Sequence, residues 1–137
     1  MKIIKIASIV GILCCLGSVS LMAQTVRVGG SSLRANGQVA QGFQYTGSCP
    51  VALKFGWGLI STGRTEVTYR FDRSDGGHTT HSERVMIPQA NHSVPVYDDW
   101  QLGANTHQFA DFHGWVNLII ESPNPIQQKI GFTIHCQ

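Results

Sequence analysis

The sequence has few charged residues, and they do not gather into a basic run. Charged side chains make up 13% of the chain, with 10 Lys and Arg against 8 Asp and Glu. Neutralisation of phosphates by basic side chains supplies most of a protein's affinity for nucleic acid. We therefore expect no nucleic-acid partner.

The sequence also lacks a hydrophobic run long enough to span a bilayer, which needs about 20 apolar residues. The clearest apolar run covers residues 6–16 and follows Lys2 and Lys5. A basic start, about a dozen apolar residues and small residues near Ala23 are typical of a secretory signal peptide. We predict that residues 1–23 are removed and that the mature protein is secreted or periplasmic, with no transmembrane segment.

Cysteines are scarce once this segment is removed. Cys14 and Cys15 lie within it, which leaves Cys49 and Cys136. Two cysteines cannot form a four-cysteine zinc site, and exported compartments permit disulfides. We predict one disulfide between Cys49 and Cys136, with two free buried thiols as the alternative.

Motifs of catalysis and cofactor binding are absent as well. The sequence has no His-Glu-x-x-His pattern, no Gly-x-Ser-x-Gly elbow and no glycine-rich phosphate loop before a helix. The side chains that could hold a metal lack the spacing of known sites; they are His78, His81, His107, His113 and, for calcium, Asp98, Asp99 and Asp111. We predict no enzyme, no cofactor and no metal site, with exposed polar side chains as the simpler interpretation.

The sequence does contain alternating apolar and polar residues between turns that recur about every ten residues. Alternation is clearest in residues 49–55, 66–73, 94–102 and 129–136. Other expected elements are an edge strand at 39–45, a hairpin return at 79–87 and a strand at 115–121. We expect flexible or turn-forming segments at 29–32 and 36–37, a turn at 74–77, and at 103–114 a long loop or a loop with one helical turn.

About seven strands in one small domain favour a particular architecture. We predict an all-β fold, an immunoglobulin-like antiparallel β-sandwich of about seven strands with one disulfide. A small closed barrel is the alternative. The sandwich is expected over residues 45–137, and residues 24–44 form an N-terminal lead or edge strand.

A series of short segments follows in order from Tyr45 onward and extends over about two thirds of the chain. They are Tyr45-Thr46-Gly47-Ser48-Cys49-Pro50, Val67-Thr68-Tyr69-Arg70-Phe71-Asp72-Arg73-Ser74-Asp75-Gly76, Trp100-Gln101-Leu102-Gly103, Gly114-Trp115, Ser122-Pro123-Asn124 and Phe132-Thr133-Ile134-His135-Cys136. This series resembles an uncharacterised type of secreted bacterial domain, thought to be an immunoglobulin-like sandwich. The resemblance implies that fold and no activity, and it does not cover residues 24–44.

Aromatic residues are the best indication of a binding surface. Trp57 stands between two glycines, where a core strand would prefer larger neighbours, so we expect it at the surface. The other candidate binding residues are Trp100, His107, Phe109, Phe112, His113 and Trp115. Exposed rings on sandwich loops suit recognition of a protein or glycan, because a rigid ring buries much area at little entropic cost. The alternative is that Trp100 and Trp115 belong to the core.

These observations predict a secreted or periplasmic, non-catalytic domain that binds a protein or glycan through its loops. A second hypothesis is a structural or self-assembling cell-envelope component that pairs through an open sheet edge. A third is a small secreted metal-binding protein or hydrolase that uses the histidines and aspartates. The sequence identifies neither a ligand nor an oligomeric state.

Overall fold

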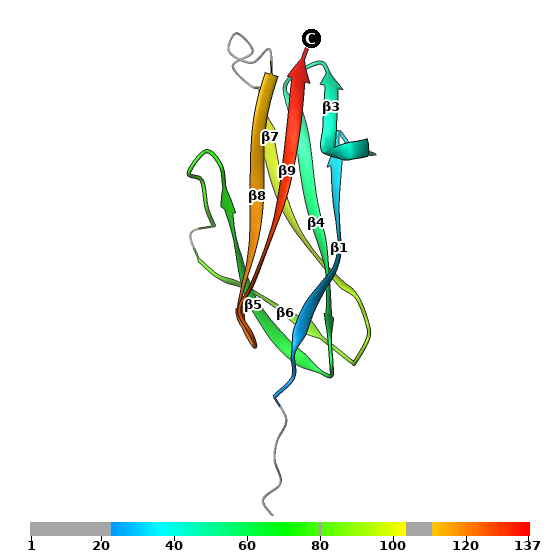
Figure 1. The fold of residues 1–137 in the computed structure, drawn as a ribbon, viewed down its shortest axis with the longest axis vertical. Helices are drawn as coiled ribbons and strands as arrows, with labels where there is room; N and C mark the ends of the chain where they lie inside the picture. The colour runs from blue at the N-terminus through cyan, green and yellow to red at the C-terminus, as the bar shows by residue number, and fades with distance from the viewer. Residues whose placement is uncertain (1–22, 80, 104–110) are drawn as a thin grey trace, which may run out of the picture.

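The structure, a computed structural model, describes residues 23–79, 81–103 and 111–137. The expected signal peptide therefore lies outside the described residues, apart from Ala23. Two β-sheets pack face to face along the length of the molecule (Figure 1). The predicted immunoglobulin-like sandwich is confirmed, although the described residues form nine strands and not about seven.

Each sheet takes strands from both halves of the chain. Sheet A has the order β2-β1-β4-β7 and sheet B the order β3-β9-β8-β5-β6. The strands are β1 (Val26–Ala35), β2 (Gln38–Val39), β3 (Gln44–Gly47), β4 (Val51–Ser61), β5 (Thr65–Arg73), β6 (Glu83–Ile87), β7 (Val94–Leu102), β8 (Asp111–Ser122) and β9 (Ile126–Cys136). Neighbouring strands are antiparallel except β3 and β9, which run parallel. No helix among the described residues is long and apolar enough to cross a membrane.

The chain passes from sheet A to sheet B between β2 and β3. The expected turn at residues 36–37 is present, with a positive φ at both Asn36 and Gly37 that suits a tight hairpin. The prediction of one continuous strand at 39–45 is wrong. This segment is divided into β2, the 3-10 helix η1 (Gln41–Phe43) and β3, because Gly42 and Phe43 also adopt positive φ and redirect the chain.

Other expected boundaries also differ from the structure, since β4 extends beyond residue 55 and β9 begins before residue 129. Residues 29–32 lie within β1 and not in a turn, because β4 pairs with β1 along its length and a bulge between Val28 and Gly30 absorbs the irregularity. Residues 111–114 belong to β8 because they pair with the end of β9. The return strand expected at residues 79–87 begins only at Glu83.

The core lies between the two sheets and follows the predicted alternation. In β4 the side chains of Val51, Leu53, Phe55, Trp57 and Leu59 are all buried. They meet inward-facing residues of sheet B, namely Val67, Phe71, Val116, Leu118, Ile120, Ile130, Phe132 and Ile134. Each such burial contributes about 1.5–3 kcal/mol, so the continuous apolar face of β4 anchors the sandwich.

The predicted disulfide is confirmed and joins the two sheets at one end. Cys49 lies just before β4 in sheet A, Cys136 ends β9 in sheet B, and their Cα atoms are 5.5 Å apart. Gly103 packs against this bridge with a φ of +80°, and a Cβ there would lie 2.7 Å from the Cβ of Cys49. The bridge therefore holds the start of β4 against the end of β9.

Candidate functional site

The expectation that Trp57 lies at the surface is wrong. Its side chain is 1% exposed and stacks on Phe71 of the opposite sheet, with ring centroids 5.4 Å apart. The two neighbouring glycines face outward, because alternation along β4 turns Gly56 and Gly58 away from the core. The small neighbours therefore shape the outer surface of sheet A and do not expose the tryptophan.

Trp100 and Phe112 also face the core. Trp100 is 7% exposed, and its ring lies edge-on to Phe112 and Phe132 at centroid distances of 6.1 and 5.7 Å. The alternative interpretation of Trp100 as a core residue is thus confirmed. His107 and Phe109 lie outside the described residues.

Trp115 and His113 are the candidates that face outward, and both lie on sheet B. Trp115 is half-buried beneath the Nζ atom of Lys129, which is 4.1 Å from the ring centroid. The exposed His113 lies 3.1 Å from the hydroxyl of Thr133 through its Nδ1 atom. Trp115 is therefore neither a loop residue nor part of the inter-sheet core.

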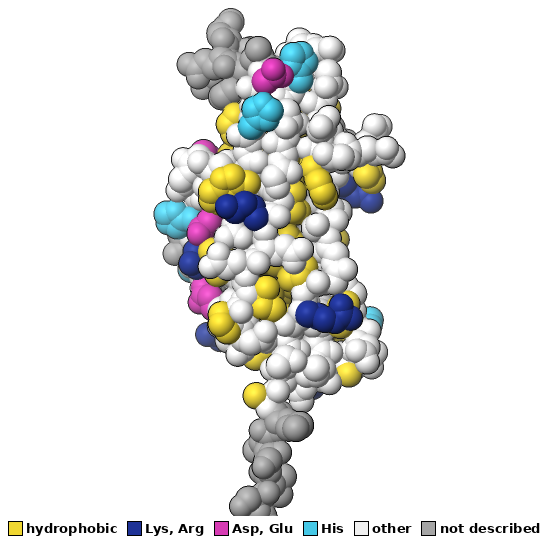
Figure 2. Space-filling model, viewed as in Figure 1, with side chains coloured by type: hydrophobic (Ala, Val, Ile, Leu, Met, Phe, Trp, Pro, Cys, Tyr) yellow, Lys and Arg dark blue, Asp and Glu magenta, His cyan; other side chains and the backbone are white. Residues whose placement is uncertain are grey.

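Histidine side chains lie beside an acidic side chain at the end of the molecule near the C-terminus (Figure 2). His135 contacts Asp111 across β8 and β9, and His113 lies on the same face. Within residues 23–79, 81–103 and 111–137, no three His, Cys, Asp or Glu side chains are placed to hold a metal ion together. The expected calcium candidates are also separated, because Asp98 is buried against Arg73 while Asp99 is exposed.

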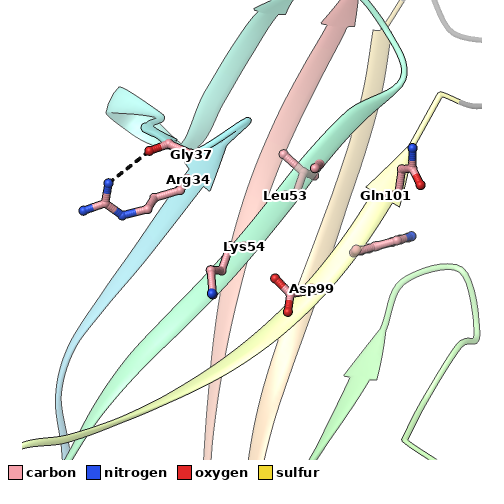
Figure 3. Close-up of a pocket in the computed structure, with 8 residues that line it drawn as sticks. Arg34, Gly37, Leu53, Lys54, Asp99 and Gln101 are labelled. Carbon is pink, nitrogen blue, oxygen red and sulfur yellow. Dashed lines mark hydrogen bonds between the residues drawn. The ribbon is translucent and has the colours of Figure 1, made fainter.

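The outer face of sheet A carries a shallow groove that the sequence did not indicate. Three adjoining hollows, with cavity volumes of about 470, 290 and 390 Å³, share lining residues from one to the next. We call this surface the sheet-A groove; it is formed by Gly30, Ser32, Arg34, Lys54, Gly56, Gly58, Ser93, Tyr97 and Asp99. Figure 3 shows the hollow between Arg34 and Gln101, crossed by β4.

Glycines make the middle of the groove hollow. A Cβ at Gly56 would lie 2.9 Å from the Oγ of Ser32 and 3.0 Å from a ring carbon of Tyr97. A Cβ at Gly58 would lie 2.7 Å from the Oγ of Ser93. The two glycines leave the backbone of β4 uncovered here. The hydroxyls of Ser32 and Ser93 and the ring of Tyr97 therefore lie directly against it.

Tyr97 is the aromatic group of the groove. It is 51% exposed, although it packs against the backbone of Gly56. The Nζ of Lys54 lies 4.7 Å from its ring centroid, in the geometry of a cation–π contact. A rigid ring, an ammonium group and nearby hydroxyls are therefore presented together on an open surface.

Tyr97 is not among the binding residues predicted from the sequence, because exposed rings were expected mainly on loops and Tyr97 lies within a strand. The signal was present: Pro95, Tyr97 and Asp99 occupy the polar phase of an alternating strand and so face away from the core. What the sequence does not reveal is that the outward glycines of β4 lie beside this ring. That juxtaposition depends on the register between β4 and β7, which pairs Gly56 with Tyr97.

No protein-family model, curated protein or solved structure matches this chain. The resemblance to secreted bacterial domains therefore stays a prediction.

Proposed function

We propose that this protein is an exported, non-catalytic domain that binds a glycan chain along the sheet-A groove. The observation that carries the proposal is the exposed ring of Tyr97 lying across the glycine floor. Sugar rings present apolar faces and hydroxyl edges, which suit an aromatic ring flanked by serine hydroxyls and a lysine ammonium group. The ring is already held against Gly56, so binding orders little that is not ordered in the free protein.

A glycan fits this surface better than a protein partner. Stable protein interfaces bury about 800 Å² on each side and depend on aromatic or aliphatic anchors that fill pockets. Among the described residues, the large hydrophobic side chains that stand well exposed are Val39, Met86 and Tyr97, and only Tyr97 lines the groove. A shallow groove with a single aromatic anchor favours an extended, polar ligand.

The groove supports binding and not glycoside hydrolysis. Most glycosidases place two carboxyl groups on either side of the scissile bond. The residues that line the three hollows include one carboxylate, Asp99. Its sequence neighbour Asp98 faces the core and is paired with Arg73.

Export is part of the proposal, and the disulfide between Cys49 and Cys136 is compatible with it. Expression of the full chain in a bacterial host, followed by mass spectrometry of the periplasm and medium, tests it. We expect a mature form that begins near Gln24. Recovery of only the uncleaved chain from the cytoplasm would contradict this part of the proposal.

Binding is tested with the mature, oxidised protein on an array of polysaccharides, with affinities measured by calorimetry. We expect Tyr97→Ala to weaken glycan binding at least tenfold. Trp115→Ala is the matched control, because it removes an aromatic ring from the outer face of the other sheet. Loss of binding in Trp115→Ala alone would move the site to sheet B, and a protein that binds no glycan but self-associates would support the envelope-assembly hypothesis instead.

A further inference from the structure

We infer that the glycan bound by the sheet-A groove is acidic and carries carboxylate or sulfate groups along its chain. This inference rests on the proposed function of the groove and adds the chemical class of its ligand. It is carried by the distribution of charge between the two sheets and by the contacts of the basic residues in the groove.

Charge is divided unevenly over a domain that is neutral as a whole. Without Lys2 and Lys5, the chain has equal numbers of basic and acidic residues. The outer face of sheet A has three basic residues and one acidic residue, namely Arg27, Arg34, Lys54 and Asp99. The charged residues that face outward from sheet B show the reverse balance, with Arg70, Arg84 and Lys129 against Glu66, Asp72, Glu83, Asp111 and Glu121.

The basic residues of the two sheets also differ in their partners. On sheet B, Arg70 forms salt bridges of 2.8 and 3.3 Å to Asp72 and Glu121, and Arg84 lies 3.8 Å from Glu66. On sheet A, Arg34 donates to the carbonyl oxygen of Gly37 (Figure 3), and Lys54 lies over Tyr97. Asp99 is paired with Lys54 across β4 and β7, but among the described residues no carboxylate lies within salt-bridge distance of Arg34 or Lys54.

These basic groups stand where a chain in the groove would pass. Arg34 and Lys54 face each other across β1 and β4, at one end of the glycine floor. Arg27 is paired with Ile60 at the other end, six residues along β4 from Lys54, which corresponds to roughly 20 Å of strand. Positive charge at both ends with Tyr97 between them suits a ligand with repeated negative charges.

The contact between Lys54 and Tyr97 shows how one sugar would be received. An exposed cation–π contact contributes only about 0.5–1 kcal/mol, so the ammonium can leave the ring at small cost. A sugar ring would take its place against Tyr97, and the ammonium would pair with the acidic group of that sugar. Lys54 and Tyr97 then act on the same residue of the ligand.

The inference is tested with pairs of polysaccharides that differ only in charge: polygalacturonate with its methyl ester, and chondroitin sulfate with its desulfated form. We expect the mature protein to prefer the charged member of at least one pair by tenfold or more. That preference should weaken as salt is raised, because exposed charges are screened. Lys54→Gln and Arg34→Gln should each reduce binding of the charged member about tenfold.

Lys129→Gln is the matched control, because this lysine also lies over an aromatic ring but on sheet B. It should leave binding unchanged, and circular dichroism should show all three variants folded. Equal binding of charged and neutral members would overturn the inference and leave the proposed function standing. Absence of binding to every glycan would overturn both the inference and the proposed function. Salt-sensitive self-association that Lys54→Gln abolishes would show instead that the groove binds the acidic outer face of sheet B in a second copy of the protein.

Discussion

The ion pair between Arg73 and Asp98 joins the sheets along one side of the sandwich, and its removal should be among the most destabilising changes to a polar residue. Asp98 points inward from β7 and is 7% exposed. Arg73, at the end of β5, donates hydrogen bonds from Nε and Nη2 to the two carboxylate oxygens of Asp98, at 3.1 and 3.0 Å. Nη2 also donates to the carbonyl oxygen of Asp99 at 2.7 Å, and the guanidinium lies 5.1 Å from the ring centroid of Trp100.

The expected loss follows from this burial. Breaking a buried pair by removing one partner typically costs 3–5 kcal/mol, because the other charge stays buried without compensation. The side chain of Arg73 is 25% exposed, so water can partly replace it. We therefore expect Arg73→Ala to lower the free energy of unfolding by about 3 kcal/mol, at the lower end of that range.

The chain offers an internal control in Arg70 and Asp72, which are 2.8 Å apart with side chains 39% and 36% exposed. An exposed pair of this kind contributes roughly 0–1 kcal/mol.

Urea unfolding of each single alanine variant and each double variant gives the coupling energy of both pairs. We expect about 2 kcal/mol for the buried pair and under about 0.5 kcal/mol for the exposed pair. Equal couplings, or a loss below about 1 kcal/mol in Arg73→Ala, would refute the argument from burial.

Three further stability predictions follow from the fold. Replacing Cys49 and Cys136 with serine opens a bridge across 87 positions and should cost up to about 4.5 kcal/mol in the chain-entropy model, measured by urea unfolding under oxidising conditions. The buried indole N–H of Trp57 has no protein acceptor among the described residues, so Trp57→Phe should change stability by less than about 1 kcal/mol while Trp57→Ala loses about 3–5 kcal/mol. A similar loss in both would mean that the N–H is satisfied in solution. Burial, and then the nearby Glu83 carboxylate, raise the pKa of Tyr69 above its usual value. The folded protein therefore keeps the phenol proton to higher pH than the unfolded chain. The contribution of this group to the free energy of unfolding is complete below about pH 10 and is lost as the pH rises further. Urea midpoints measured from about pH 8 to 11 should fall less steeply in Tyr69→Phe, and identical slopes would contradict the assignment.

Local patterns in the sequence were sufficient to predict the class of fold. Period-two alternation depends only on neighbouring residues, so β5 and β7 were placed nearly correctly, whereas β4 extends six residues beyond the expected segment and β9 begins three residues before it. The disulfide followed from arithmetic, because only Cys49 and Cys136 remain outside the expected signal peptide. The turn at Asn36 and Gly37 was predictable because these residue types tolerate positive φ.

Predictions failed where a residue's environment came from a distant strand. Trp57 was expected at the surface because of its glycine neighbours, but in a strand those neighbours face the opposite side. Residues 29–32 have the composition of a turn, yet pairing with β4 extends β1 through them.

The sequence by itself determined that the chain forms an all-β fold with two cysteines available for one bridge, because strand alternation and cysteine number are local or countable properties. Only the tertiary structure decided where a ligand could bind. The groove needs Ser32, Gly56 and Tyr97 side by side, and these residues come from three strands whose register is set by packing of the core. The division of the strands between two sheets separates the basic face of sheet A from the acidic face of sheet B, although their charges are interspersed along the chain.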